Sequence, residues 1–278
     1  MAVASSVAVD EAVASIDNIG DVSQDQVNHA QQQLLAIPEA LREQAANPYG
    51  AQLLILVILL DKNTAVRQLQ LSLLNKQLGA QHKNNAEALF EKTIKLESKQ
   101  VLPLIDLAIP TLREMTLDQY QVFKQLVQQF IAADKKVNLR EWVIQRLVLQ
   151  HLEDSYQLRQ SPVAKYFVLG SAKKSIEIVL SLLSYVEHKD DKEEAVKAFN
   201  AAKKSIAAGA LKICDKNDIS LQQLDAAMDD LVLLKYPLKR RFLQACVSCI
   251  HHNGTVTVKS YELMRAVASC LDCPMPAL

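Results

Sequence analysis

Residues 117–148 read LDQYQVFKQLVQQFIAADKKVNLREWVIQRLV, and this stretch decides the fold because it occurs twice. Residues 236–267, YPLKRRFLQACVSCIHHNGTVTVKSYELMRAV, match it without gaps. The matched pairs are Phe123 with Phe242, Ile131 with Ile250, Val137 with Val256, Asn138 with Thr257, Trp142 with Tyr261 and Arg146 with Arg265. In both copies apolar residues recur at helical spacing on either side of a short polar turn. Each copy is therefore predicted to be an αα-hairpin.

The turn of each hairpin contains residues that suit tight backbone geometry. It falls at Asp134-Lys135-Lys136 in the first copy and at Asn253-Gly254 in the second. Asp and Asn bond to nearby backbone in turns, and Gly adopts positive φ without steric cost. Val137 and Val256 precede the next helix and are placed to staple its start. Because such a hairpin cannot bury its apolar face alone, we expect the two copies to pack together in a single compact bundle.

Helical periodicity recurs along almost the whole chain. Thr116 with Gln119, and Asn138 with Glu141, have the spacing of capping boxes, which satisfy unpaired amides at a helix start. A further helix is expected to have Pro103 in its first turn and to end at Met115. The other ranges expected to be helical are roughly 23–36, 38–46, 51–60, 63–78, 84–96, 172–187, 190–207, 221–234, 237–251 and 258–271.

Composition indicates the fold class. Hydrophobic residues make up 50% of the 278 residues, and only six are Gly and eight Pro. Strand-rich folds need more turn residues than this. The predicted fold is therefore all-α, a multi-helix bundle built partly from two related αα-hairpins. We expect a partly ordered N-terminal segment at 1–22, an N-terminal helical lobe at 23–155 and a C-terminal helical lobe at 156–278, with 151–171 as the least regular segment.

Charge and hydropathy restrict the partners. The 31 basic and 31 acidic residues cancel, whereas binding to nucleic acid requires a basic face. No stretch indicates an anchor for anionic membranes. The longest apolar run, LLILVILL at 53–60, is shorter than the roughly 20 residues that span a bilayer, and we expect a buried helix there. Five Cys without a secretory signal indicate free thiols in a reducing compartment.

Four cysteines are candidate zinc ligands. Cys246-x-x-Cys249 and Cys270-x-x-Cys273 have a spacing that occurs in zinc sites. However, Cys246 and Cys249 fall on the apolar stripe of a predicted helix, where a free Cys behaves as a small hydrophobic residue. A redox pair would need a helix N-terminus to lower the thiol pKa, and this pair lies mid-helix. We therefore favour buried thiols over zinc ligands.

Other polar clusters have simpler interpretations. Glu193-Glu194 and Asp229-Asp230 are adjacent acids, which point about 100° apart on a helix and form no acid–base dyad. Lys239-Arg240-Arg241 is too small for a nucleic-acid footprint. Gly170-Ser171 precedes a predicted helix, and we expect these residues to turn the chain and cap that helix, although a helix start can also hold an anion.

Several motifs resemble known families. The phrase AxDxxVxxxEW at 132–142 and its counterpart in the second copy resemble the TerB-type helical unit. The pieces AVASSVA, NPYGAQLLILVILLD, YPLKRRFLQAC and LDCPMPAL, in this order, resemble the C-terminal extension of bacterial membrane-anchored zinc metallopeptidases of the HtpX-like class. This second resemblance covers essentially the whole chain.

The resemblance implies a parent protein whose zinc protease domain precedes this region. That family's His-Glu-x-x-His motif is absent from this chain, so we expect no catalytic, cofactor-binding or metal residues here, and zinc only in the parent's catalytic domain. The implied role is a non-catalytic regulatory or interaction domain at the cytoplasmic face of the inner membrane. Its partner would be its own protease domain or another protein, without nucleic acid and without insertion of this chain into the membrane.

The alternative is a free-standing TerB-like module linked to stress or to cations. TerB-like units sometimes carry acidic residues in the turn, and the corresponding residues here are Asp134 and Asn253. Calcium takes six to eight oxygen ligands, often from several carboxylates. A single Asp flanked by two Lys favours a turn role over a cation-binding role.

Overall fold

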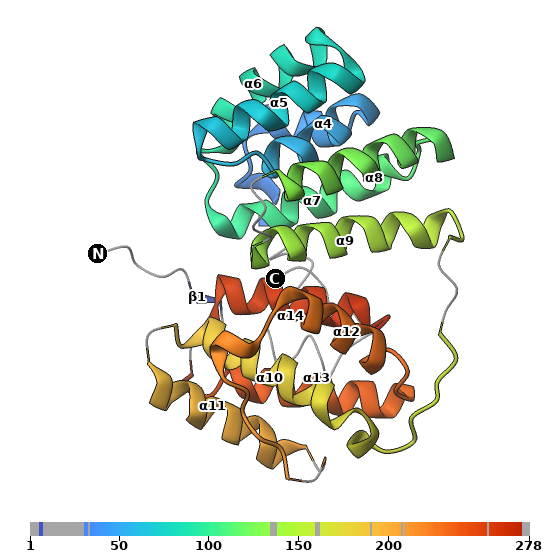
Figure 1. The fold of residues 1–278 in the computed structure, drawn as a ribbon. Coiled ribbons are helices and arrows are strands. Elements are labelled where there is room, and N and C mark those ends of the chain that lie inside the picture. The colour runs from blue at the N-terminus through green and yellow to red at the C-terminus, as the bar shows by residue number, and fades with distance from the viewer. Residues whose placement is uncertain are drawn as a thin grey trace. The chain divides into compact units, whose positions relative to one another are not determined.

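The computed structural model describes residues 6–7, 31–32, 34–133, 138–158, 162–189, 191–206, 208, 210–254 and 256–273. These residues form twelve α-helices, α3 to α14, with two short 3-10 helices and one pair of two-residue strands (Figure 1). The prediction of an all-α, multi-helix fold is confirmed.

The chain divides into two compact units. Asn28–Arg159 forms the N-terminal unit, and Gln160–Leu278 together with Met1–Val27 forms the C-terminal unit. Each unit contains one copy of the repeated hairpin, so the chain does not form the single compact bundle that was expected. The division falls at Arg159, four residues after the last helix of the N-terminal unit ends at Ser155.

The N-terminal unit surrounds one apolar helix. Its helices are α3 (Glu39–Ala45), α4 (Pro48–Ile58), α5 (Thr64–Leu78), α6 (Ala80–Thr93), α7 (Ser98–Leu112), α8 (Leu117–Ala132) and α9 (Leu139–Ser155). Helix α4 packs against α3, α6, α7 and α8, and each of its residues from Leu53 to Val57 is at most 3% exposed. The LLILVILL run is therefore a buried helix, as predicted. No helix in the described part of the chain is long and apolar enough to cross a membrane.

A buried amide holds the end of this central helix. The Gln70 side chain on α5 donates from Nε2 to the carbonyl oxygens of Leu59 (3.1 Å) and Phe130 (3.0 Å). Its Oε1 accepts from the backbone N–H of Asp61 (2.9 Å). A buried polar group is costly unless its hydrogen bonds are made. Here they are made, and they join the ends of α4 and α8.

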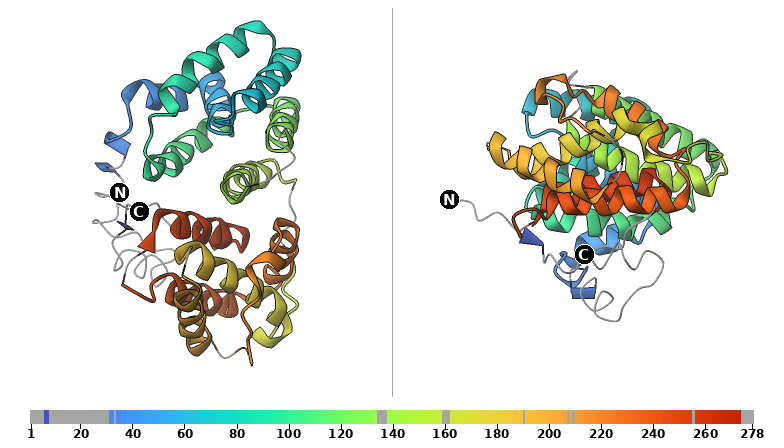
Figure 2. Two further views of the ribbon diagram at one scale, coloured as in Figure 1. Left: turned by 60° about the vertical axis from the view of Figure 1, so that its left-hand side comes forward. Right: turned by 90° about the horizontal axis from the view of Figure 1, so that it is seen from below.

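The C-terminal unit is arranged in the same way around α10. Its helices are α10 (Lys173–Glu187), α11 (Lys192–Ser205), α12 (Leu221–Leu231), α13 (Tyr236–Ile250) and α14 (Val258–Cys270), with 3-10 helices at Leu169–Ala172 and Lys216–Asp218. Helix α10 packs against the other four α-helices (Figure 2). Its residues Ile176, Val179, Leu180 and Leu183 are fully buried.

A short strand pair and a buried carboxylate fix the second hairpin. Strand β1 (Ser6–Val7) pairs antiparallel with β2 (Val256–Thr257), so part of the predicted N-terminal segment 1–22 belongs to the C-terminal unit; the rest of that segment lies outside the described residues. Thr257 donates from its backbone N–H (3.0 Å) and its hydroxyl (3.1 Å) to the carboxylate of Glu187. The end of α10 is thereby fixed to the start of α14.

The two hairpins share their helix starts and caps. Leu117 and Tyr236 begin their first helices, and Asn138 and Thr257 cap their second helices, at aligned positions. In the second copy Gly254 has a φ of 80°, which a residue with a side chain rarely adopts. The turn of the first copy, 134–137, lies outside the described residues.

Three helices begin earlier than predicted, and α4 is one of them, because it begins at Pro48 rather than at residue 51. Helix α6 begins at Ala80 rather than near residue 84, and α7 begins at Ser98, so Pro103 lies inside the helix and not in its first turn. A capping box of Glu97 and Gln100, which the sequence analysis overlooked, stabilises this earlier start. Proline removes only the hydrogen bond to the carbonyl four residues before it, and that carbonyl belongs to an exposed residue of the first turn.

We expect Gly50→Ala to lower the free energy of unfolding by about 1–3 kcal/mol, as overpacking does. A Cβ at Gly50 would lie 2.5 Å from the carbonyl oxygen of Gln44. Urea unfolding followed by circular dichroism measures the change. Gly170→Ala is the control, because a Cβ there meets nothing within 4 Å, and its effect should stay within about 0.5 kcal/mol. Equal stability of the two variants would contradict the close approach of α3 and α4.

Candidate functional site

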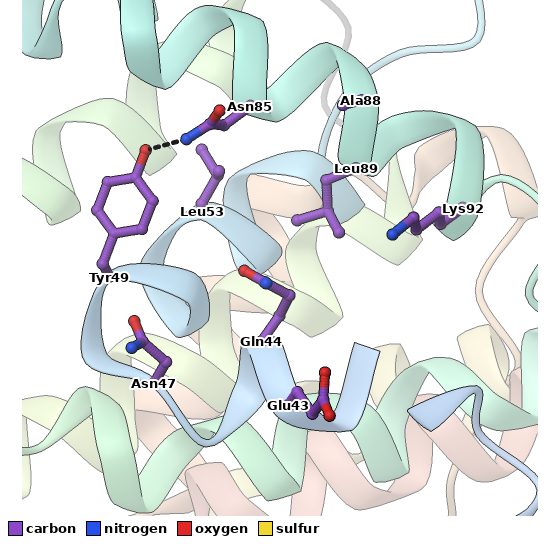
Figure 3. Close-up of a pocket in the computed structure, with 9 residues that line it drawn as sticks. All are labelled: Glu43, Gln44, Asn47, Tyr49, Leu53, Asn85, Ala88, Leu89 and Lys92. Carbon is purple, nitrogen blue, oxygen red and sulfur yellow. Dashed lines mark hydrogen bonds between the residues drawn. The ribbon is translucent and has the colours of Figure 1, made fainter. Parts of the chain in front are cut away.

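An open pocket of about 500 Å³ lies in the N-terminal unit, between the α3–α4 corner and α6 (Figure 3). Its lining residues are Glu43, Gln44, Asn47, Tyr49, Leu53, Asn85, Ala88, Leu89 and Lys92. Leu53 and Leu89 are buried and supply its apolar part, whereas most of the remaining residues are polar or charged. This volume is within the range of pockets that bind small ligands. A second cavity in the same unit is about 100 Å³ and too small for such a role.

The start of α4 places Tyr49 beside the pocket. Asn47 caps this helix, because its Oδ1 accepts from the N–H of Gly50 (3.0 Å). The ring of Tyr49, in the first turn, lies 4.8 Å from the ring of His82, centroid to centroid. The phenol oxygen accepts from Nδ2 of Asn85 (2.9 Å; Figure 3). Tyr49 is nevertheless 39% exposed, and its own hydroxyl proton is left for a ligand.

Three further side chains of the pocket have polar groups to offer. The Gln44 amide, the Glu43 carboxylate and the Lys92 ammonium make no hydrogen bond or ion pair within the described part of the chain. Together they present donors, acceptors and both signs of charge around an apolar floor. The lining residues include no Ser, Thr, Cys or His and only one carboxylate.

The four candidate zinc ligands, Cys246, Cys249, Cys270 and Cys273, are each at most 5% exposed. Burial raises the pKa of Cys246 and Cys273 above that of an ordinary thiol and raises the pKa of Cys249 to about 12. A thiol that ligates a metal is deprotonated, which burial opposes. Among the described residues, no group of three or more His, Cys, Asp or Glu side chains could hold a metal ion.

Cys249 is packed against the central helix of its unit. Its sulfur lies 3.1 Å from the hydroxyl oxygen of Ser184 and donates to the carbonyl of Leu180 at 3.6 Å. Both partners belong to α10. The thiol therefore contributes to the packing of α13 on α10, as a small hydrophobic residue with a weak donor does.

The remaining polar clusters make structural contacts. The Asp230 carboxylate accepts from the hydroxyls of Tyr166 (2.6 Å) and Ser175 (2.5 Å). Lys239 is buried and donates to the carbonyl of Leu271 (2.9 Å), so the run Lys239-Arg240-Arg241 is not a continuous basic face. Ser171 does not cap α10 as predicted, because the residue before that helix is Ala172. Asp134 lies outside the described residues.

No match is found among models of protein families, curated proteins or solved structures. The resemblances to metallopeptidase extensions and to TerB-type units therefore stay predictions from the sequence. The pocket was not predicted from the sequence. Its local signal was the Asn-Pro-Tyr-Gly start of α4, where a cap and a proline place an aromatic residue in the exposed first turn.

Thiol labelling distinguishes buried thiols from zinc ligands. In the native protein only the half-exposed Cys214 should react readily with a maleimide. We expect the other four cysteines to react about a hundredfold more slowly, because reaction requires local or global opening. A chelator should leave these rates unchanged, and denaturant should raise them. Faster labelling after addition of the chelator alone would show that a metal protects the thiols.

Proposed function

We propose that this chain is a non-catalytic helical interaction domain, and that its N-terminal unit binds a short segment of a partner polypeptide in the pocket beside Tyr49. One observation carries the proposal. The pocket combines a 39% exposed aromatic ring and an unpaired amide with the apolar surface of Leu53 and Leu89. The resemblance to a regulatory extension supports it independently.

The chemistry of a polypeptide fits this lining. A peptide backbone presents N–H donors and C=O acceptors in alternation, and the Gln44 amide can pair with both. The hydroxyl of Tyr49 adds a donor, and the apolar floor accepts one side chain. Tyrosine is also enriched among the residues that dominate binding at protein interfaces. Glu43 and Lys92, with opposite charges, would select the orientation or the charge pattern of the bound segment.

The resemblance identifies a partner. In this proposal the chain is the cytoplasmic C-terminal region of a membrane-anchored zinc metallopeptidase and docks against, or regulates, its own protease domain. The support is the order of the four motifs along the chain, from AVASSVA to LDCPMPAL. The sequence upstream of this region tests the assignment. We expect it to encode apolar spans and a His-Glu-x-x-His motif, and an unrelated upstream domain or a stop codon would refute it.

Selection of peptides on the purified chain tests the pocket. A random displayed peptide library is selected on the wild-type protein, and the enriched peptides are then measured against Ala88→Trp by fluorescence anisotropy. Ala88 is an exposed lining residue of α6, so a tryptophan there should fill the pocket without unfolding the helix. We expect affinity to fall at least about tenfold, equivalent to about 1.4 kcal/mol.

Ala65→Trp is the matched control, because Ala65 is an exposed alanine of α5 outside the pocket. It should bind the selected peptides like the wild type. Enrichment of no peptide, or equal binding by Ala88→Trp, would refute the pocket as the docking site. The non-catalytic assignment would be refuted if the purified chain turned over peptidase or esterase substrates and Ala88→Trp abolished that turnover.

A further inference from the structure

The C-terminal unit exposes a group of large apolar side chains that its own core leaves uncovered. Val163, Phe167, Val168 and Tyr236 have exposed fractions of 78%, 66%, 61% and 56%. Scattered single apolar residues are ordinary on a protein surface, but a group of them marks an interaction site. We call these four residues, together with the exposed cations of residues 162–174 and 232–241, the aromatic–basic surface.

Backbone pairing brings together the two segments that form this surface. The N–H groups of Lys165 (2.8 Å) and Tyr166 (3.0 Å) donate to the carbonyl of Leu233, and the N–H of Lys235 donates to the carbonyl of Tyr166 (3.2 Å). The ammonium of Lys235 lies 3.9 Å from the centre of the Phe167 ring. Phe167 therefore directly follows the paired residues of its own segment, and its ring lies against an exposed lysine of the other segment.

The side chain of Tyr166 fixes the position of the first segment. Its hydroxyl donates to Asp230 of α12, which also accepts from Ser175 of α10. The extended residues 162–168 are thus tied to two helices of the unit. This attachment holds Phe167 and its neighbours outward, so their exposure follows from the fold of the segment.

The same two segments concentrate positive charge in a chain whose net charge is zero. Residues 162–174 contain Lys165, Lys173 and Lys174 and no acid, and residues 232–241 contain four basic residues and no acid. Lys239 is buried, which leaves six cations at least partly exposed.

Two of the three nearest acids along the chain already have hydrogen-bond or ion-pair partners. The Asp230 carboxylate accepts the two hydroxyls described above, and Glu177 lies 3.9 Å from Lys173 while it accepts from the N–H of Lys212 (2.8 Å). Asp229 is exposed on α12. The cations of the two segments therefore outnumber the available carboxylates.

We propose that the aromatic–basic surface binds the anionic surface of a lipid bilayer. Phe167, Tyr236 and the two valines enter the interfacial region, and the surrounding lysine and arginine side chains contact lipid phosphates. Aromatic side chains favour this region. Each cation near an anionic bilayer contributes about 1 kcal/mol, so the exposed cations of the two segments add to what the apolar side chains contribute. The surface lies in the C-terminal unit and does not depend on the peptide pocket of the other unit.

The shape of the surface favours a bilayer over an acidic peptide. Peptide recognition usually uses a groove or hollow that encloses the anchoring side chains of the partner. Here the four apolar side chains each expose more than half of their surface, so they project and do not line a hollow. Projecting side chains on two segments that contain cations and no acid match a bilayer, into which they insert.

Co-sedimentation of the full chain with lipid vesicles tests this proposal. We expect the protein to sediment with vesicles of phosphatidylcholine and phosphatidylglycerol in equal amounts and to stay in solution with phosphatidylcholine alone. High salt should release it, because the Debye length falls to about 3 Å at 1 M. Phe167→Ser with Tyr236→Ser, and separately Lys165→Glu with Arg241→Glu, should each weaken binding at least about tenfold, or about 1.4 kcal/mol.

The control makes the same kinds of change elsewhere. Leu69→Ser with Lys76→Glu replaces an exposed apolar residue and a lysine on α5 and should bind vesicles like the wild type. The circular dichroism and urea unfolding of all variants establish that they are folded. The proposal would be overturned if the protein did not sediment with the vesicles that contain phosphatidylglycerol. It would also be overturned if the control variant lost as much binding as the two test variants. Another contrary result would be binding of a Glu-rich aromatic peptide by a protein that does not bind vesicles, with the peptide binding lost in the Phe167→Ser, Tyr236→Ser double variant.

Discussion

Each unit depends on one central apolar helix that the neighbouring helices must cover. Helix α4 contains the first six residues of the LLILVILL run, Leu53–Ile58, and a helix that is apolar all round is stable in water only when neighbours cover every face. Helices α3, α6, α7 and α8 provide this cover. The capped first turn of α4, from Pro48 to Gly50, meets α6 and the end of α3, and the pocket lies there. The candidate site is thus a consequence of how the central helix is enclosed.

Buried polar groups fix the positions of helix ends in each unit. Gln70 joins the ends of α4 and α8, and Glu187 joins the end of α10 to Thr257 at the start of α14. The contact of Gln70 with Phe130 and that of Glu187 with Thr257 link residues 60 and 70 apart in sequence. An apolar core tolerates many arrangements of similar volume, whereas a buried amide or carboxylate without its partners is costly. These two side chains therefore give each unit a single arrangement of its helix ends.

Local signals predicted the helices well and the pocket not at all. The caps at Thr116 and Asn138 were recognisable because each bonds within three residues. The capping box at Glu97 was not predicted, because Pro103 indicated a later helix start. The contact of Tyr49 with Asn85 joins residues 36 apart in sequence. Periodicity and capping carry no information on such pairs, so the pocket was not predictable from them.

The two copies of the repeat agree at buried positions and differ at exposed positions. Phe123 and Phe242, at aligned positions, are both buried, because each hairpin must cover the core of its own unit. The exposed positions of the same helices have diverged: residues 117–122 contain no Lys or Arg, whereas the aligned residues 236–241 contain the exposed Arg240 and Arg241. Leu117 and Tyr236 both begin their helices with an exposed apolar side chain, but only Tyr236 is followed within its first six helical residues by exposed arginines. A surface that binds anionic lipid therefore needs the second copy, together with the segment 162–168 that pairs beside its start.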